Sequence, residues 1–459
     1  MIKERTTRGL AEARTRRAPS LSLLAAGALL LAGCDLGVTN PALVEEGDLD
    51  TPNAVPAIVN GALGTFGMAT TIMGAAGTYS ASAILSGELV HSGSWTPPRE
   101  ISEGFPNNES PENQSHWGFS SQARWQAEDA IGKVSGLVTN PGQNEWVALA
   151  QLYAGFSNRV MGEMFCDAVI DGGPKLPFSA FSERAVTYFD DAVQTSQAGG
   201  HGELRLAALA GRAQARLMLG QVDQAVADAS QVPTDFIYAH VHSDNSSSEH
   251  NGVHNWTYRG DSSWQYTVWG TPFADWGRDA TDGGMAGDPR VTYTRMFTAA
   301  GAPQIGGDNR RPVWRADKYP SRNSPIPLAK GTEMRLIEAE ALLRGGNVPG
   351  AVGKINEVRT HHGLGSASAS TPAEGWQLLM RERGLELFLE GRRLGDVRRW
   401  AADSQSAPHV GYEFVGGIAS GQPASADPKR NVLDASPLCL RVSTNEIFSN
   451  PNLQGNPPR

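Results

Sequence analysis

The sequence has few cysteines, no long hydrophobic run and no excess of basic residues. Its most apolar segment, Leu21–Leu31, is too short to cross a bilayer core of about 30 Å as a helix. The formal net charge is −9 at pH 7. An acidic chain is unsuited to non-specific binding of nucleic acid, which requires a basic surface, so we expect no nucleic-acid partner.

Cysteine is scarce, with 3 residues in a chain of 459. Two of them, Cys166 and Cys439, lie so far apart that they are weak evidence for a disulfide. We expect two unpaired thiols, and a disulfide between them is the alternative. The chain also lacks the Gly-x-Ser-x-Gly, phosphate-loop and Cys-x-x-Cys motifs, so no local signature of an enzyme stands out.

The N-terminal segment has the three parts of a secretory signal. Basic residues from Lys3 to Arg17 precede the apolar run, which ends in Leu31-Ala32-Gly33-Cys34. Small residues directly before a cysteine resemble a bacterial lipobox. We therefore expect residues 1–33 to be a lipoprotein signal peptide, Cys34 to be lipidated and residues 34–52 to form a polar tether. An ordinary signal peptide with an incidental cysteine is the alternative.

An internal repeat is the strongest sign of organisation. The pattern of Ala213–Val232 recurs 126 residues later in Ala339–Val358. Each copy reads as a small-residue helix, a glycine turn and a second helix with apolar residues every three or four positions. This pattern is typical of tetratricopeptide-type hairpins. We predict a mostly α-helical fold class of stacked hairpins in one domain over residues 53–459, with a last helix from about Trp376 to Trp400.

Two loop-rich regions interrupt the helical pattern. Residues 88–117 are rich in serine, proline, asparagine and glycine, and residues 233–330 combine glycine and aspartate with many aromatic side chains. Neither region has a helical period along most of its length. Because loops of this length are usually functional, we expect ligand contacts to come from them.

Several separated blocks carry a resemblance to a known family, and they occur in the family's order. They are Asp288-Pro289-Arg290, Glu333–Ala341, Ile355–Arg359, Arg381–Arg393, Asp396–Trp400 and the ending Asn445–Leu453, preceded by the lipobox and Val38-Thr39-Asn40-Pro41. Together they resemble the SusD/RagB family of nutrient-binding outer-membrane lipoproteins. The resemblance spans the chain from Cys34 onward.

The resemblance implies a SusD-like α-α superhelix that captures oligosaccharides, or related polymer fragments, without a chemical step. It also implies delivery to a TonB-dependent SusC-like β-barrel transporter and a lipid anchor in the outer membrane, facing outward. Asp35 follows the lipidated cysteine, a position where an acidic residue retains some lipoproteins at the inner membrane; we still expect the outer membrane. The alternatives are a peptide-binding uptake lipoprotein, a helical-repeat scaffold or a surface glycoside hydrolase.

The candidate binding residues are aromatic, because a sugar ring has an apolar face that stacks on indole or phenol. In the family, binding loops come from regions that correspond here to residues 88–117 and 256–293. The ligand-binding candidates are Trp95, Arg99, Trp264, Tyr266, Trp269 and Trp276, with Asp275 and Arg278 as polar partners. For each ring the alternative is a place in the packed interior of the loops.

Glu382, Glu386 and Glu390 recur at four-residue spacing, as residues on one helix face do. Arginines surround them in the sequence, so we predict structural ion pairs. A glycosidase acid–base pair is the alternative. Nearby arginines lower carboxyl pKa values, however, which is unsuitable for a general acid.

Metal-binding patterns are weak, and we expect no cofactor. Asp279, Asp282 and Asp288 surround Gly283-Gly284 and are weak candidates for structural calcium, although their spacing is not that of an EF-hand loop. His240, His242, His250 and His254 lie in a polar, serine-rich stretch. We expect these histidines to be solvated rather than to hold a transition metal.

Overall fold

The computed structural model describes residues 46–71, 77–258, 265–411, 413–415, 429–431, 438–455 and 457. The predicted signal peptide, Cys34, most of the tether and Trp264 lie outside these residues. Leu49–Arg459 forms one compact unit, and Met1–Asp48 is a separate one. Within the described ranges, no helix combines the length and apolar character needed to cross a bilayer.

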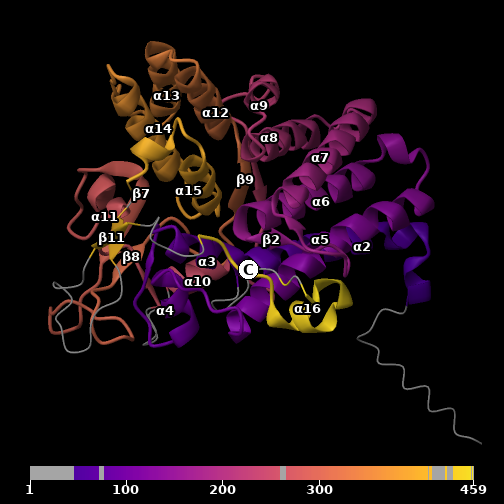
Figure 1. Cartoon of the computed structure of the whole chain (residues 1–459), viewed down its shortest axis with the longest axis horizontal. Coiled ribbons are helices and arrows are strands. Elements are labelled where there is room, and N and C mark those ends of the chain that lie inside the picture. Colours follow the sequence, from indigo (N-terminus) through magenta and orange to yellow (C-terminus); the bar gives the residue numbers. More distant parts are fainter. Residues whose placement is uncertain are drawn as a thin grey trace, which may run out of the picture. The chain divides into compact units, whose positions relative to one another are not determined.

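Most of the compact unit is an array of helices that pack on their neighbours in sequence (Figure 1). In order, they are α2 (Val55–Thr71), α5 (Pro111–Leu137), α6 (Glu145–Met164), α7 (Ser179–Gly199), α8 (Gly202–Met218), α9 (Val222–Ala229), α12 (Gly331–Arg344), α13 (Val348–His361) and α14 (Pro372–Glu386). The contact between α9 and α12 continues the array across the long intervening segment. The predicted fold class, mostly α with tetratricopeptide-like hairpins, is confirmed.

The two copies of the sequence repeat are the hairpins α8–α9 and α12–α13. Ala213 and Ala339 occupy equivalent places on the first helices and are both fully buried, which lets the second helix approach closely. The turns contain Gly220 and Gly346, with φ of 72° and 76°. Only glycine adopts this left-handed conformation without steric cost, which explains the glycine in each copy.

The predicted continuous helix from Trp376 to Trp400 is wrong. The chain leaves α14 at Glu386, and six residues separate it from the start of α15 (Arg393–Ala402). Leu389 and Gly391 between them have φ of 58° and 71°. A Cβ on Gly391 would lie 2.3 Å from the Tyr79 ring, so the break is set by a close tertiary contact that helical periodicity does not reveal.

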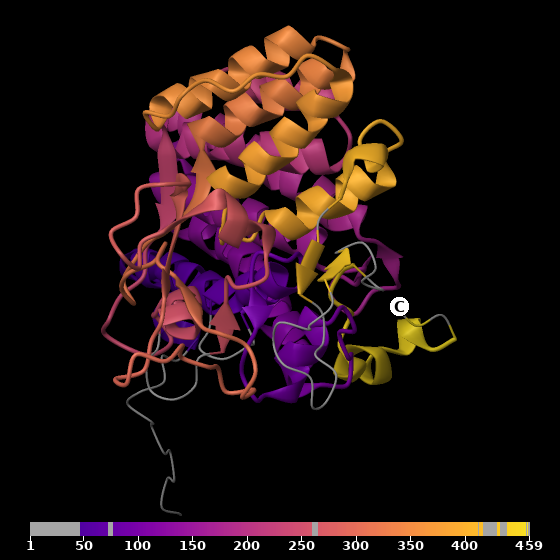
Figure 2. The same cartoon turned by 90° about the vertical axis from the view of Figure 1, so that its left-hand side faces the viewer.

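The two predicted loop regions contain more regular structure than expected (Figure 2). The first holds β1 (Val90–His91), α4 (Thr96–Ser102) and the start of α5, where the Ser110 hydroxyl accepts from Asn113 N–H at 3.1 Å. The second holds β4 (Ile237–His240), α10 (Gly252–Tyr258), β5 (Tyr266–Thr267), α11 (Pro272–Trp276), β6 (Gly277–Asp279), β7 (Asp288–Arg295), β8 (Trp314–Ala316) and β9 (Ile326–Lys330). These elements are mostly too short for periodicity to show.

Small sheets join distant parts of the chain. β4 pairs antiparallel with β9, β1 pairs antiparallel with β5, and β7 lies between β6 and β8. The remaining elements are α3 (Thr78–Leu85), β2 (Asp167–Ala168), β3 (Leu176–Pro177), β10 (Glu413–Val415), β11 (Lys429–Asn431), α16 (Thr444–Ser449) and short 3₁₀ turns.

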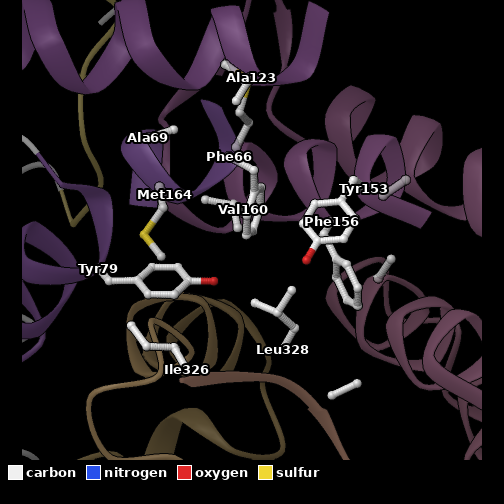
Figure 3. Packing of buried hydrophobic residues seen from close by; sticks show 14 of the residues in the cluster. Phe66, Ala69, Tyr79, Ala123, Tyr153, Phe156, Val160, Met164, Ile326 and Leu328 are labelled. Atoms are coloured by element: carbon white, nitrogen blue, oxygen red, sulfur yellow. The ribbon is translucent and has the colours of Figure 1, made fainter. Parts of the chain in front are cut away.

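The main hydrophobic core lies between α2, α6 and β9. Figure 3 shows the rings of Phe66, Tyr153 and Phe156 close together, with Leu328 of β9 facing them. The Phe66 and Tyr153 rings meet edge to face, with centroids 5.3 Å apart. A fully buried side chain of this size contributes about 1.5–3 kcal/mol. This core fixes the helical array against the ribbon β4–β9.

Cys166 and Cys439 form a disulfide, so the expectation of two unpaired thiols is wrong. The backbones also pair there: Cys166 N–H donates to Leu440 O at 2.9 Å, and Leu440 N–H donates to Met164 O at 2.7 Å. The Cα atoms of the two cysteines are 5.2 Å apart across a sequence separation of 273. The disulfide ties the end of α6 to the C-terminal segment.

Candidate functional site

Trp95 is the most exposed tryptophan of the predicted set that the structure describes. Trp95 is 47% exposed and is the N-cap residue of α4. The ring of Trp256 from α10 lies 6.2 Å from it, and Tyr266 from β5 lies 5.3 Å from Trp256. We call these three residues the Trp95 platform. An exposed indole supported by further rings is suited to stack on an apolar ring face.

Backbone pairing brings the platform residues together. His91 of β1 faces Tyr266 of β5 in the antiparallel ladder, and Ser92 N–H donates to Gln265 O at 2.7 Å. Pro97 in the first turn of α4 favours a helix start directly after Trp95. Segments separated by more than 170 residues in sequence therefore meet at one place.

A polar hollow of about 530 Å³ lies beside α4. It is lined by Gly93, Ser94, Arg99, Glu103, Gly307, Asp308, Arg310 and Arg311. We call this set the polar hollow. Its side chains are donors and acceptors of the kind that bind the hydroxyls of a polar ligand.

A tight turn forms one wall of the polar hollow. Asp308 N–H donates to Ser92 O at 2.9 Å, and the Asp308 carboxylate accepts from the N–H groups of Arg310 and Arg311 at 2.9 and 3.0 Å. A Cβ on Gly306 would lie 2.3 Å from Ser92 O, so only glycine permits this approach. The turn is therefore fixed to the strand that leads to Trp95.

Arginine dominates the charge of the polar hollow. Arg311 is buried, pairs with Asp308 at 2.8 Å and donates to His91 O at 3.1 Å. Burial, together with the nearby charges of Arg311 and Arg99, lowers the pKa of His91 to about 3. His91 is therefore neutral at pH 7, and arginine supplies the positive charge of the site.

The structure brings together three of the predicted residues. Trp95 is the N-cap of α4, and Arg99 lies four residues further on, within the helix. Tyr266 is buried and supports the platform from below Trp256 rather than offering its own surface. Residues that sequence reasoning missed complete the site: Trp256, Glu103, Asp308, Arg310 and Arg311. The last three lie within the predicted loop-rich region 233–330 but beyond residues 256–293, which contain the aromatic candidates of that region.

The other predicted residues lie elsewhere. Trp269 is half-buried and packs against the core cluster around Leu336 and Trp376. Trp276 meets the ring of Phe273 edge to face at 5.3 Å, and the Arg381 guanidinium lies 5.8 Å from its centroid. Both rings thus fill packing space.

Among their polar neighbours, Asp275 is exposed on α11 and Arg278 is half-buried on β6. Neither contributes to the polar hollow. Trp264 lies outside the described residues.

The three calcium candidates do not come together, because in the described part of the chain no group of three or more metal-binding side chains converges. Asp279 pairs with Arg295 at 2.5 Å, and Asp288 pairs with Arg290 at 2.7 Å. Burial alone would raise the pKa of Asp288, but Arg290 lowers it below its usual value. Asp282 is exposed and distinct from these ion pairs. Arginine thus neutralises the carboxylates that a calcium ion would need.

His240 and His242 are buried, so the expectation of solvated histidines is wrong for these two. They line a second hollow of about 480 Å³ between α2, α6 and β4. The Tyr153 hydroxyl lies 3.1 Å from His240 Nδ1. Burial lowers the pKa of His240 to about 3 and that of His242 to about 4, so both are neutral at pH 7.

The predicted ion pairs of the Arg381–Arg393 block are confirmed. Glu382 pairs with Arg290 and Arg359 at 2.7 and 2.6 Å. Glu386 pairs with Lys330 at 3.0 Å, and Glu390 pairs with Lys318 at 2.6 Å. The single helix face was wrong, because Glu390 lies beyond the end of α14. The cations in these pairs also lie outside the block, whereas the arginines near the glutamates in sequence had suggested them as partners.

The electrostatics of this block do not suit a general acid. Burial would raise the pKa of Glu386, but Lys330 and His362 hold it well below its usual range. Glu386 is therefore ionised at neutral pH, whereas a general acid must carry a proton.

Comparisons with known proteins agree with this architecture. The SusD family model matches residues 240–458. A SusD-like carbohydrate-binding protein of Bacteroides fragilis has a TM-score of 0.66 at 14% identity, covering 88% of this chain and 99% of its own. One from Bacteroides vulgatus has a TM-score of 0.61 at 15% identity, covering 89% and 98%.

A SusD/RagB family protein of Bacteroides thetaiotaomicron shares the fold with a TM-score of 0.56 at 14% identity, covering 88% of this chain and 95% of its own. No curated protein sequence matches the chain. At such low sequence identity, these structures show a shared fold and nothing more. The family model adds a match in sequence over residues 240–458. Taken together, the family model matches the C-terminal part of the chain, and the helical array has the fold of SusD-like proteins, in agreement with the resemblance of the ordered blocks to the SusD/RagB family.

Proposed function

We propose that the protein binds oligosaccharides at the Trp95 platform and the polar hollow. The observation that carries this proposal is the half-exposed indole of Trp95, supported by Trp256, at the residue that follows Gly93 and Ser94 in the wall of a hollow lined by arginine and carboxylate side chains. A sugar ring stacked on the indole would place its hydroxyls within reach of those groups. Two solved proteins of this fold are described as carbohydrate-binding, which supports the ligand class.

Capture without catalysis is the mechanism we propose. The carboxylates of the Arg381–Arg393 block are ion-paired, and Asp308 in the polar hollow is held by Arg311 and two backbone N–H groups. A glycosidase instead needs one carboxyl that stays protonated and a second carboxylate at a suitable distance from it. Peptide binding and a scaffold role are outcomes that the binding experiment below also tests.

Replacing Trp95 by alanine is expected to weaken oligosaccharide binding at least about tenfold, because one stacking surface is lost from the centre of the site. Isothermal titration of the purified protein with a panel of glycans and peptides measures this. The matched control is Trp125→Ala, since Trp125 is 51% exposed on α5, away from the polar hollow. Equal affinities of the Trp95→Ala variant and the native protein, or binding of peptides alone, would contradict the proposal.

We also propose that a lipid on Cys34 anchors the protein in the outer membrane, facing outward, where it passes its ligand to a TonB-dependent SusC-like transporter. The lipobox-like segment and the match of the SusD family model to residues 240–458 support this. Affinity purification from detergent-solubilised membranes is expected to recover a large β-barrel protein in similar amount. Cys34→Ser should move the protein to the soluble fraction. A native protein that is abundant in membranes but purifies alone would refute the partnership.

A further inference from the structure

The polar hollow contains more guanidinium groups than carboxylates, although the whole chain is acidic. We infer that the captured oligosaccharide carries negatively charged substituents, uronate carboxylates or sulfate esters, and that Arg99 binds one of them beside the sugar stacked on Trp95. This inference rests on the proposed function and narrows its ligand class. It assigns to Arg99 a role in selecting the ligand.

The charge balance of the polar hollow is the first support. Three arginines, Arg99, Arg310 and Arg311, line it together with two carboxylates, Glu103 and Asp308. Asp308 and Arg311 pair with each other at 2.8 Å, and both also bind backbone atoms of the hollow's wall. They serve the structure of the wall. The lining therefore carries one more guanidinium than carboxylate.

Arg99 itself is the second support. It is half-buried on α4, and within the described ranges its guanidinium makes no ion pair or side-chain hydrogen bond. The buried arginines elsewhere in the fold contrast with it: Arg290, Arg383 and Arg392 each pair with at least one carboxylate. A guanidinium that lines a hollow with donors to spare can bind a carboxylate or sulfate with two parallel hydrogen bonds.

The geometry of α4 links the charge to the stacking surface. Trp95, Arg99 and Glu103 recur at four-residue spacing, and the last two both line the polar hollow. Trp95 is the N-cap of α4 and Arg99 lies within this short helix, so one local element carries both side chains. A charged substituent of a sugar stacked on Trp95 can therefore reach Arg99 without a second binding surface.

The overall charge makes this arrangement informative. With a formal net charge of −9, the protein as a whole repels anions. A locally positive hollow therefore does not follow from composition. It attracts anions over a short range, because salt screens charges beyond about 8 Å at physiological ionic strength.

The test compares ligands that differ only in charge. Titrations of the purified protein use galacturonate oligomers against the same oligomers with methyl-esterified carboxylates, and sulfated galactan oligosaccharides against their desulfated forms. At least one charged form is expected to bind about tenfold or more tightly than its neutral partner. The advantage should shrink as sodium chloride rises from about 50 to 500 mM. The two ligand pairs distinguish carboxylate from sulfate.

Variants assign the preference to Arg99. Arg99→Gln is expected to abolish most of the advantage of the charged form, and Arg99→Lys to retain part of it. Arg205→Gln on α8, which removes an arginine bonded only to Gln231, should leave the advantage unchanged. Each variant should unfold at the same temperature as the native protein, which establishes that its fold is intact.

The outcomes separate this inference from the proposed function. Equal binding of charged and neutral oligomers, with both weakened by Trp95→Ala, would overturn the anionic ligand and leave oligosaccharide binding in place. A charge preference that survives Arg99→Gln would overturn the role of Arg99. Failure to bind any charged or neutral oligosaccharide would overturn the proposed function itself.

Discussion

Replacing Arg383 by methionine is expected to lower the free energy of unfolding by about 3–5 kcal/mol. Arg383 is fully buried and donates to both carboxylate oxygens of Asp396, at 2.8 and 2.9 Å. It also lies 3.4 Å from the carboxylate of Glu333. Methionine fills much of the same volume but removes the positive charge beside two buried carboxylates. Urea unfolding followed by circular dichroism measures the change.

The matched control is Arg381→Met on the same helix. Arg381 is exposed, and its closest aromatic contact is Trp276, so this change should cost less than about 1 kcal/mol. If the two variants were equally stable, the buried ion pairs would not hold the C-terminal helices in place.

The same ion pairs predict how stability depends on pH. Burial would raise the pKa of Asp396, but Arg383 and Arg399 lower it to about 2, below the ordinary value of 3.8. A carboxyl group with a lowered pKa in the folded state stabilises the fold above its unfolded pKa. That contribution is lost as pH falls from about 4 towards 2. In the Arg383→Met variant, protonation of Asp396 on acidification should cost less of the free energy of unfolding.

Removing the disulfide with Cys166→Ser and Cys439→Ser is expected to lower the free energy of unfolding by about 5 kcal/mol. The bond closes a loop across 273 residues, and the entropy that a cross-link removes from the unfolded chain grows with loop length. The oxidised native protein and the double variant are compared by urea unfolding, and a reducing agent should affect only the native protein. A loss below about 1 kcal/mol would mean that the backbone pairing of Phe165 with Leu440 suffices.

The repeat predicted the fold class through local periodicity, and the ordered blocks predicted it through their resemblance to a known family. The Ala213 and Ala339 helices, each followed by a left-handed glycine, are visible in any window of about twenty residues. The break after Glu386 is different. Leu389 adopts a left-handed conformation because Gly391 must approach Tyr79, a residue more than 300 positions away in sequence.

The candidate site could be predicted only in part. Trp95 and Trp276 have the same chemistry and both lie in loop-rich segments, yet one is half-exposed and the other packs on Phe273 and Arg381. Tertiary contacts make that difference, and composition does not encode it. Arg310 and Arg311 reach the site only because the turn at Asp308 binds Ser92.

A crystal structure of the protein with its tightest-binding oligosaccharide tests the central claim most directly. We expect a sugar ring stacked on the indole of Trp95, with another polar group of the ligand in hydrogen-bonding distance of Arg99 in the polar hollow. A ligand seated instead in the hollow lined by Tyr153, His240 and His242, with Trp95 bare, would contradict the account.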